Sequence, residues 1–224
     1  MAAIVRRAAI IPAAGFGTRL GKGPKGFLKL GDRTLIEWTA HTLLPIVDRI
    51  VVAVPEGFEQ AAQKLLPDCT IICGANSRHM SLVKLFEQSF AETVLIQDAA
   101  RPFASRALCN AVIHAAEIHG AAGAFLDPVV PVGTIENDAV GQFWHRHEVG
   151  IFQAPQAFSH ALLDDAMSRP DAELFQSTAQ LVIDSGQPLF AVQGEAENIK
   201  ITSPLDWEIA EKVLAPKLKN SGIY

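Results

Sequence analysis

A glycine-rich loop near the N-terminus combines the backbone and side-chain groups that a bound phosphate chain requires. The loop follows the apolar run at residues 8–12 and contains Gly15 and Gly17. Glycine leaves backbone N–H groups uncovered, so phosphate oxygens can approach them closely. Three cations lie in the same stretch: Arg19, Lys22 and Lys25. Because charge-assisted hydrogen bonds from several cations suit a triphosphate, we predict a triphosphate site here; a plain glycine turn with solvated lysines is the alternative.

Two familiar phosphate-binding loops do not fit this stretch. The P-loop pattern fails because Gly17 and Gly21 are one residue too close, and because Gly23 follows Lys22 where a hydroxyl should bind magnesium. The dinucleotide fingerprint G-x-G-x-x-G fails because Leu20 replaces its third glycine. The loop therefore belongs to another class of phosphate site.

An acid and an arginine follow a predicted buried strand at residues 93–97. Asp98 and Arg101 should lie at the same sheet edge as the glycine loop, because parallel strands present their carboxyl ends together. A carboxylate there suits Mg²⁺ and an arginine suits a phosphate monoester, although Asp98 could also merely cap a helix.

Two further segments carry polar groups beside predicted elements. Residues 74–81 (GANSRHMS) offer hydrogen-bonding groups for the edge of a base, although helix capping alone would explain Asn76 or Ser77. Lys200 lies in an alternating pattern at residues 197–202, which predicts a strand. A lysine that faces inward there needs an anionic partner, whereas on an exposed edge it needs none.

The elements that must position these residues alternate between strand and helix. Apolar runs predict strands at residues 8–12, 49–54, 70–72, 93–97, 121–125 and 189–193. Helical spacing predicts helices at residues 34–44, 56–66, 81–90, 105–120, 159–167, 172–183 and 204–214. This alternation predicts an α/β fold, a doubly wound and mostly parallel sheet. Residues 129–153 break the pattern and predict a projecting β-hairpin arm around the turn-rich residues 136–141.

Composition limits the classes of partner. The 224 residues carry a formal net charge of −5, which argues against a nucleic-acid or anionic-membrane surface and favours a small anionic ligand. No stretch approaches the ~20 apolar residues of a membrane span. The three cysteines show no metal or redox spacing and suit a reducing cytoplasm. We expect one domain over residues 1–224.

Taken in order, the motifs resemble the 2-C-methyl-D-erythritol 4-phosphate cytidylyltransferase family of the non-mevalonate isoprenoid pathway. The matching stretches are A-A-G-F-G-T-R-L, P-K-G-F-L, G-A-N-S-R-H-M-S, D-A-A-R-P, A-P-Q-A-F and E-N-I-K-I-T-S-P. The resemblance implies a Rossmann-like nucleotidyltransferase fold and transfer of CMP from CTP to a polyol phosphate with release of pyrophosphate. It also implies Mg²⁺ as cofactor and a homodimer formed through the arm.

The resemblance assigns roles to individual positions. The nucleotide-binding positions are Ala13, Ala14, Gly15, Gly17, Ala75, Asn76, Ser81 and Asp98, with Asp98 beside the metal. The catalytic positions are Arg19, Lys25, Arg146 and Lys200. The acceptor-binding positions are Arg101, Thr134, Arg146 and Lys200, of which Thr134 and Arg146 would serve the partner subunit's site.

The departures from the family pattern lie on the acceptor side. Gly133 and Glu136 replace an acid and a base of the arm, Ala154 replaces a threonine, and Gln176-Ser177 replaces T-D. The polyol phosphate is therefore less firmly indicated than the nucleotide. The alternatives are an enzyme for another polyol phosphate such as ribitol 5-phosphate, a molybdopterin or sugar-1-phosphate nucleotidyltransferase, and a nucleotide-binding paralogue without turnover.

Overall fold

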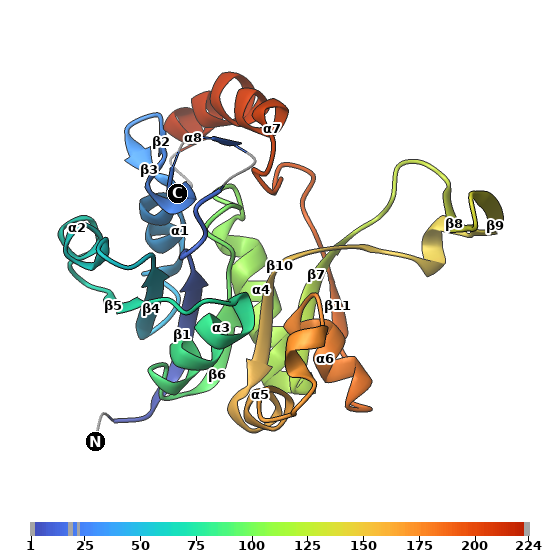
Figure 1. Ribbon diagram of the computed structural model, residues 1–224, viewed down its shortest axis with the longest axis horizontal. Helices are drawn as coiled ribbons and strands as arrows, with labels where there is room; N and C mark the ends of the chain where they lie inside the picture. Colours follow the sequence, from blue (N-terminus) through green and yellow to red (C-terminus); the bar gives the residue numbers. More distant parts are fainter. Residues whose placement is uncertain (1–2, 18–19, 22, 222–224) are drawn as a thin grey trace.

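A computed structural model describes residues 3–17, 20–21 and 23–221 of the chain. Among these residues, seven strands form one sheet in the order β11-β7-β10-β6-β1-β4-β5 (Figure 1). Their bounds are β1 (Val5–Pro12), β4 (Arg49–Val54), β5 (Thr70–Cys73), β6 (Ala91–Ile96), β7 (Ala121–Leu126), β10 (Ile151–Ser159) and β11 (Phe190–Gln193). Every neighbouring pair is parallel except those of β10, which runs antiparallel to β6 and β7. The predicted fold class is confirmed.

The central strands are continuous apolar runs because helices cover both faces of the sheet. In β1, Ile10 lies opposite Val51 of β4 and Ile96 of β6, and all three are fully buried. The helices are α1 (Leu35–Leu43), α2 (Glu59–Leu65), α3 (Arg78–Glu87), α4 (Arg106–His119), α5 (His160–Met167), α6 (Thr178–Asp184), α7 (Pro204–Ile209) and α8 (Ala215–Ser221). Side chains of α1, α2 and α4 pack on one face, and those of α3, α5 and α6 on the other.

The last helices form a separate apolar cluster beside the glycine-rich loop. The π-helical turn Ala210–Leu214 joins α7 to α8 in one continuous helical segment. Trp207 and Leu214 pack with Leu20 of the loop and with Trp38 of α1. Two short strands, β2 (Lys29–Leu30) and β3 (Arg33–Thr34), and a 3₁₀ turn at Lys25–Phe27 complete this region. The C-terminal helical segment therefore packs against the glycine-rich loop at Leu20.

Several predicted elements differ from the structure. The helix predicted at residues 172–183 is wrong as one element: a 3₁₀ turn (Ala172–Leu174) and α6 are separated by an extended stretch, and Ser177 caps α6 with its side chain. The helix predicted at residues 81–90 begins three residues earlier, because Ser77 accepts the Met80 N–H and caps α3. The helix predicted at residues 56–66 is shorter at both ends.

The arm is a two-stranded hairpin that projects from the sheet (Figure 1). It consists of β8 (Val132–Glu136) and β9 (Ala139–Trp144), followed by a 3₁₀ turn at Arg146–Glu148. Asn137 and Asp138 at its tip have φ angles of 49° and 65°, as a tight two-residue hairpin requires. The predicted hairpin is confirmed. None of the helices in the described part of the chain combines the length and apolarity needed to span a bilayer.

Candidate nucleotidyltransferase site

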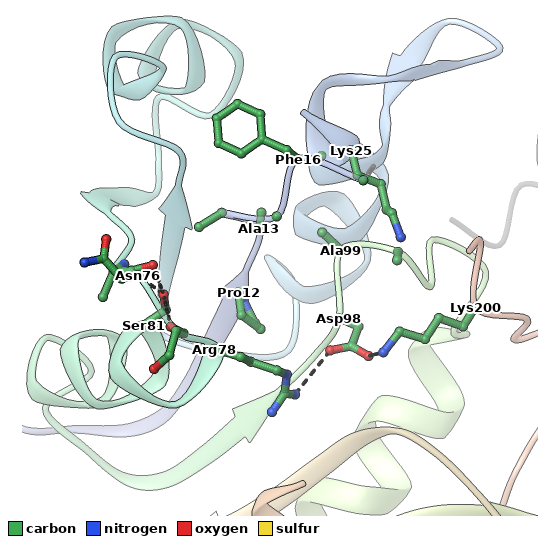
Figure 2. Close-up of a pocket in the computed structure, with 17 residues that line it drawn as sticks. Pro12, Ala13, Phe16, Lys25, Asn76, Arg78, Ser81, Asp98, Ala99 and Lys200 are labelled. Atoms are coloured by element: carbon green, nitrogen blue, oxygen red, sulfur yellow. Dashed lines mark hydrogen bonds and ion pairs between the residues drawn. The ribbon is translucent and has the colours of Figure 1, made fainter. Parts of the chain in front are cut away.

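A cleft of about 450 Å³ lies at the carboxyl ends of β1, β5 and β6. Figure 2 shows side chains from these strand ends and from the C-terminal segment converging on it. The described residues that line it include ten predicted site residues: Ala13, Ala14, Gly15, Gly17, Lys25, Ala75, Asn76, Ser81, Asp98 and Lys200. The structure thus brings the residues predicted for the nucleotide together with Lys25 and Lys200, which were predicted as catalytic, although Ala13 and Lys200 are 187 positions apart in the sequence. Arg19 and Lys22, two of the three cations predicted for the phosphates, lie outside the described residues.

Small residues allow the loops that form the cleft to approach one another. A Cβ at Gly74 would lie 2.4 Å from the Cβ of Ala14, so the loops after β5 and β1 touch at this point. Gly17 has a φ of +60°, a conformation that side chains other than glycine rarely adopt. The Lys25 N–H donates to the Gly15 carbonyl at 3.2 Å and closes the glycine-rich loop on itself. The loop is held in shape by backbone contacts of its own.

The segment predicted for base recognition is fixed by one serine. The Ser81 hydroxyl accepts the Ala75 N–H at 2.9 Å and lies 2.9 Å from the Ser77 carbonyl, to which it can donate. Ser77 in turn donates to Glu173 at 2.8 Å, which ties this segment to the turn before α6. Asn76 lies between Ala75 and Ser77, which these hydrogen bonds hold in place, and its own side chain is exposed at the cleft. Its amide can both donate and accept, which is what a base edge requires.

Asp98 supplies the one carboxylate among the described residues that line the cleft. It lies between two cations: Lys200 Nζ at 2.8 Å and Arg78 Nη2 at 3.5 Å (Figure 2). Burial raises the pKa of Asp98, but the charges of Lys200 and Arg78 and the hydrogen bond from Lys200 outweigh it. The pKa therefore lies below its usual value. Asp98 is an ionised, paired carboxylate at neutral pH.

Lys200 reaches the cleft from an irregular segment, so the strand predicted at residues 197–202 is wrong. The backbone there bonds to several partners instead of to one neighbouring strand. The Ile201 N–H donates to the Ala100 carbonyl at 2.8 Å, and Lys25 Nζ donates to the Ile201 carbonyl at 3.0 Å. The alternation of residue types reflects these separate anchors. Of the two alternatives left open for Lys200, the structure shows the one with an anionic partner, which is Asp98.

Three predicted acceptor-side residues are not among the described residues that line the cleft. Arg101 donates through Nη1 to the Asn198 carbonyl at 2.6 Å, and its burial lowers its pKa against the opposing effect of Asp98. Thr134 and Arg146 lie on the arm, where they bond to the Gln142 N–H and the Val129 carbonyl. Their roles at an acceptor remain predictions.

Among the lining residues that were not predicted as site residues, Arg78 and Phe16 have side chains that could contact a ligand. Arg78 lines this cleft and an adjoining cavity of about 190 Å³, whose wall includes Gln176 and Ser177. Phe16 lies between the two loop glycines with 56% of its surface exposed, at the cleft wall. The signals were a cation within the base-recognition segment and an aromatic residue within a phosphate loop. Ala154, by contrast, is only 6% exposed and lines neither cavity.

Two glycine substitutions distinguish an effect on ligand binding in the cleft from an effect on the packing of its loops. A Cβ at Gly15 meets nothing within 4 Å, so Gly15→Ala should change the free energy of unfolding by less than about 0.5 kcal/mol. Its methyl group enters the cleft, so calorimetry should show weaker binding of a nucleoside triphosphate. Gly74→Ala, in contrast, should lower the free energy of unfolding by roughly 1–3 kcal/mol, because its Cβ would clash with Ala14. Unchanged binding by Gly15→Ala would contradict the site.

A second prediction concerns the titration of Asp98. Because its folded-state pKa is lowered, Asp98 stabilises the fold above about pH 4, the unfolded-chain value, and loses this contribution as the pH falls through the folded-state value. Lys200→Met removes the main lowering effect, so NMR of the Asp98 carboxyl carbon should show a raised pKa. The control is Lys212→Met, which breaks a surface pair with Glu208. An unmoved Asp98 titration in Lys200→Met would contradict the pairing.

Comparisons with known proteins agree with this geometry. The family model for 2-C-methyl-D-erythritol 4-phosphate cytidylyltransferase (IspD) matches residues 7–216. The protein of that name from Deinococcus radiodurans is 38% identical over 208 residues, which cover 92% of this chain and 88% of that protein.

Solved structures agree in fold. The crystal structure of 2-C-methyl-D-erythritol 4-phosphate cytidylyltransferase from Thermus thermophilus has a TM-score of 0.79 and 35% identity, and the match covers 95% of this chain and 100% of that one. The 4-diphosphocytidyl-2C-methyl-D-erythritol synthase from Anaerococcus prevotii has a TM-score of 0.83 and 27% identity, with 94% and 98% covered. The chain described here therefore belongs to the 2-C-methyl-D-erythritol 4-phosphate cytidylyltransferase family.

Proposed function

We propose that this protein transfers CMP from CTP to 2-C-methyl-D-erythritol 4-phosphate and releases pyrophosphate. The observation that carries the proposal is one cleft in which a glycine-rich loop, a base-recognition segment and the Asp98–Lys200 pair meet. The names of the relatives at 35–38% identity supply the acceptor and the cytidylyl group that is transferred to it. Isoprenoid precursor synthesis is the pathway in which this reaction belongs.

The reaction needs no nucleophile from the protein. A phosphate oxygen of the acceptor attacks the α-phosphorus of CTP, and the bond from that phosphorus to the bridging oxygen breaks. Pyrophosphate leaves with the electron pair of that bond. Backbone N–H groups of the glycine-rich loop, together with Arg19 and Lys25, would neutralise charge on the phosphates. Lys200 would hold the acceptor phosphate in line, so that catalysis consists of positioning and electrostatic stabilisation.

We also propose Mg²⁺ as the cofactor, with Asp98 as its protein ligand. No group of three or more His, Cys, Asp and Glu side chains suited to a metal occurs among the described residues. This fits magnesium, which is commonly held by one or two carboxylates together with substrate phosphates and waters. When bound, the ion would neutralise triphosphate charge. Asp98 would then exchange its partners Lys200 and Arg78 for the ion.

We further propose a homodimer built through the arm. Exposed apolar side chains gather on and beside the hairpin: Val129, Val130, Ile135, Val140, Phe143, Trp144 and Ile151. A lone hairpin with this much apolar surface needs a covering partner. The arm projects from the central sheet (Figure 1), and neither Thr134 nor Arg146 lines the cleft of its own chain, so both would serve a second subunit's acceptor.

The acceptor and the compartment complete the proposal. Gly133 and Glu136 lie on the arm and Gln176 beside the cleft, so these departures leave another polyol phosphate such as ribitol 5-phosphate as the second candidate substrate. We place the enzyme in the cytoplasm, since all three cysteines are free thiols.

A pyrophosphate-release assay tests the reaction. CTP with 2-C-methyl-D-erythritol 4-phosphate should give the highest kcat/KM, ahead of ATP, GTP or UTP and ahead of ribitol 5-phosphate. Lys25→Ala should lower kcat on the order of 10²-fold, because one well-aimed cation is lost. The control is Lys29→Ala, an exposed lysine of the neighbouring strand that does not line the cleft. Preference for ribitol 5-phosphate would change the substrate, and full activity of Lys25→Ala would remove the triphosphate assignment.

Deletion of residues 135–144 tests the arm. We expect a folded monomer in sedimentation, because the hairpin lies outside the central sheet and its buried clusters. Turnover should disappear while CTP binding persists, since the deleted residues do not line the nucleotide cleft. A wild-type protein that sediments as a monomer would contradict the dimer.

A further inference from the structure

We propose that Asn198 and Gln153, together with Arg101, form a buried positioning network for Lys200. The network would govern use of the acceptor phosphate and leave nucleotide binding unaffected. This inference rests on the proposed function, because it assigns Lys200 to the acceptor. It gives Arg101 a role through Lys200, in addition to the direct acceptor contact that the family resemblance implies.

The two amides form a reciprocal pair beneath the segment that carries Lys200. Asn198 is fully buried and Gln153 is 5% exposed. The Asn198 amide donates to the Ala154 carbonyl at 2.7 Å and lies 3.4 Å from Gln153 Oε1. Gln153 Nε2 lies 3.1 Å from the Glu195 carbonyl and 3.4 Å from that of Asn198, while its Oε1 accepts the Glu195 N–H. Gln153 therefore fixes the chain from Glu195 to Asn198.

Two further contacts hold the segment on either side of Lys200. Arg101 Nη1 donates to the Asn198 carbonyl at 2.6 Å, and the Ile201 N–H donates to the Ala100 carbonyl at 2.8 Å. The loop after β6, which carries Asp98, is thus hydrogen-bonded to the chain on both sides of Lys200. The ammonium group of Lys200 meets Asp98 itself.

The network is anchored to rigid parts of the fold. Gln153 lies in β10, where the chain returns from the arm to the sheet. Glu195 accepts from the Ser105 N–H at 3.0 Å and from the Ser105 hydroxyl, which also caps α4. The network thus joins the base of the arm, the start of α4 and the Lys200 segment. The base of the arm therefore lies beside the Lys200 segment of the same chain.

Two buried polar atoms of the network have no hydrogen-bond partner: Asn198 Oδ1 and Arg101 Nε. Buried unpaired groups cost folding free energy and are therefore uncommon in structural networks.

Alternatively, the network only tethers an irregular segment to the sheet. The two explanations differ in what they predict for kinetics, because misplacement of a positioning cation by about 1 Å can cost 10²-fold in rate.

Two variants separate positioning from tethering. Asn198→Ala removes the amide, and Gln153→Met keeps the volume without the hydrogen bonds. The matched control is Ser89→Ala, which removes a hydroxyl that is equally buried but bonds to the Phe86 carbonyl, away from the cleft. We expect kcat/KM for the acceptor to fall on the order of 10²-fold in both network variants. The dissociation constant for CTP should stay within about twofold, and Ser89→Ala should have wild-type kinetics whatever its stability.

The same variants in a Lys200→Met background test whether the network acts through Lys200. Asn198→Ala should then cause no further fall in kcat/KM. A further fall of the same size, or an equal loss of CTP affinity, would overturn the proposal.

A spectroscopic readout separates this inference from the proposed reaction. In reductively ¹³C-methylated protein, the Lys200 signal is assigned by its loss in Lys200→Met. It should move in Asn198→Ala and stay in place in Ser89→Ala, even if the wild-type protein shows no turnover with any polyol phosphate. Absence of turnover would contradict the proposed function alone, whereas an unmoved Lys200 signal would contradict the network.

Discussion

The ion pair between Asp98 and Lys200 is the contact on which the rest of the site depends. Its two residues are 102 positions apart, in the loop after β6 and in the segment after β11, which lie on opposite sides of β10 and β7 in the sheet order. The Asp98 side chain is only 14% exposed, and a largely buried carboxylate without a partner would be destabilising. The chain after β11 returns to the carboxyl ends of the strands, where Lys200 lines the cleft together with Asp98.

The other contacts of the cleft have two effects. Some let the loops approach one another closely, and others fix the conformation of those loops. Gly74 lets two loops touch where a Cβ would clash, and the glycine-rich loop leaves its backbone open to phosphates. Ser81 and Ser77 fix the segment predicted for base recognition, while Lys25 ties the glycine-rich loop to the Lys200 segment through the Ile201 carbonyl. A site of this kind suits catalysis by holding two phosphorylated substrates in line, for which an activated protein nucleophile is not required.

The sequence predicted those parts of the site whose residues are neighbours along the chain. The strand end at residues 8–12, the segment 74–81 and Asp98 each carry a local signature, because parallel strands place their carboxyl ends at one edge. The strand predicted around Lys200 is wrong because Ile199 and Ile201 alternate with Lys200 and Thr202 without any strand beside them. The two isoleucines instead pack in the apolar cluster of the C-terminal helices. The hydrogen bond from Arg101 to Asn198 spans 97 positions and leaves no local trace. The break before α6 was hidden because Ser177 caps a helix within an otherwise helical pattern.

A crystal structure of the protein with CTP and Mn²⁺ would test the central claim most directly. We expect the triphosphate along residues 13–25, the cytosine edge at Ala75, Asn76 and Ser81, and an anomalous peak for Mn²⁺ beside Asp98. Lys200 should have left Asp98 and point into the space for the acceptor phosphate. A nucleotide bound elsewhere, or a metal peak away from Asp98 with the Asp98–Lys200 pair intact, would contradict the account.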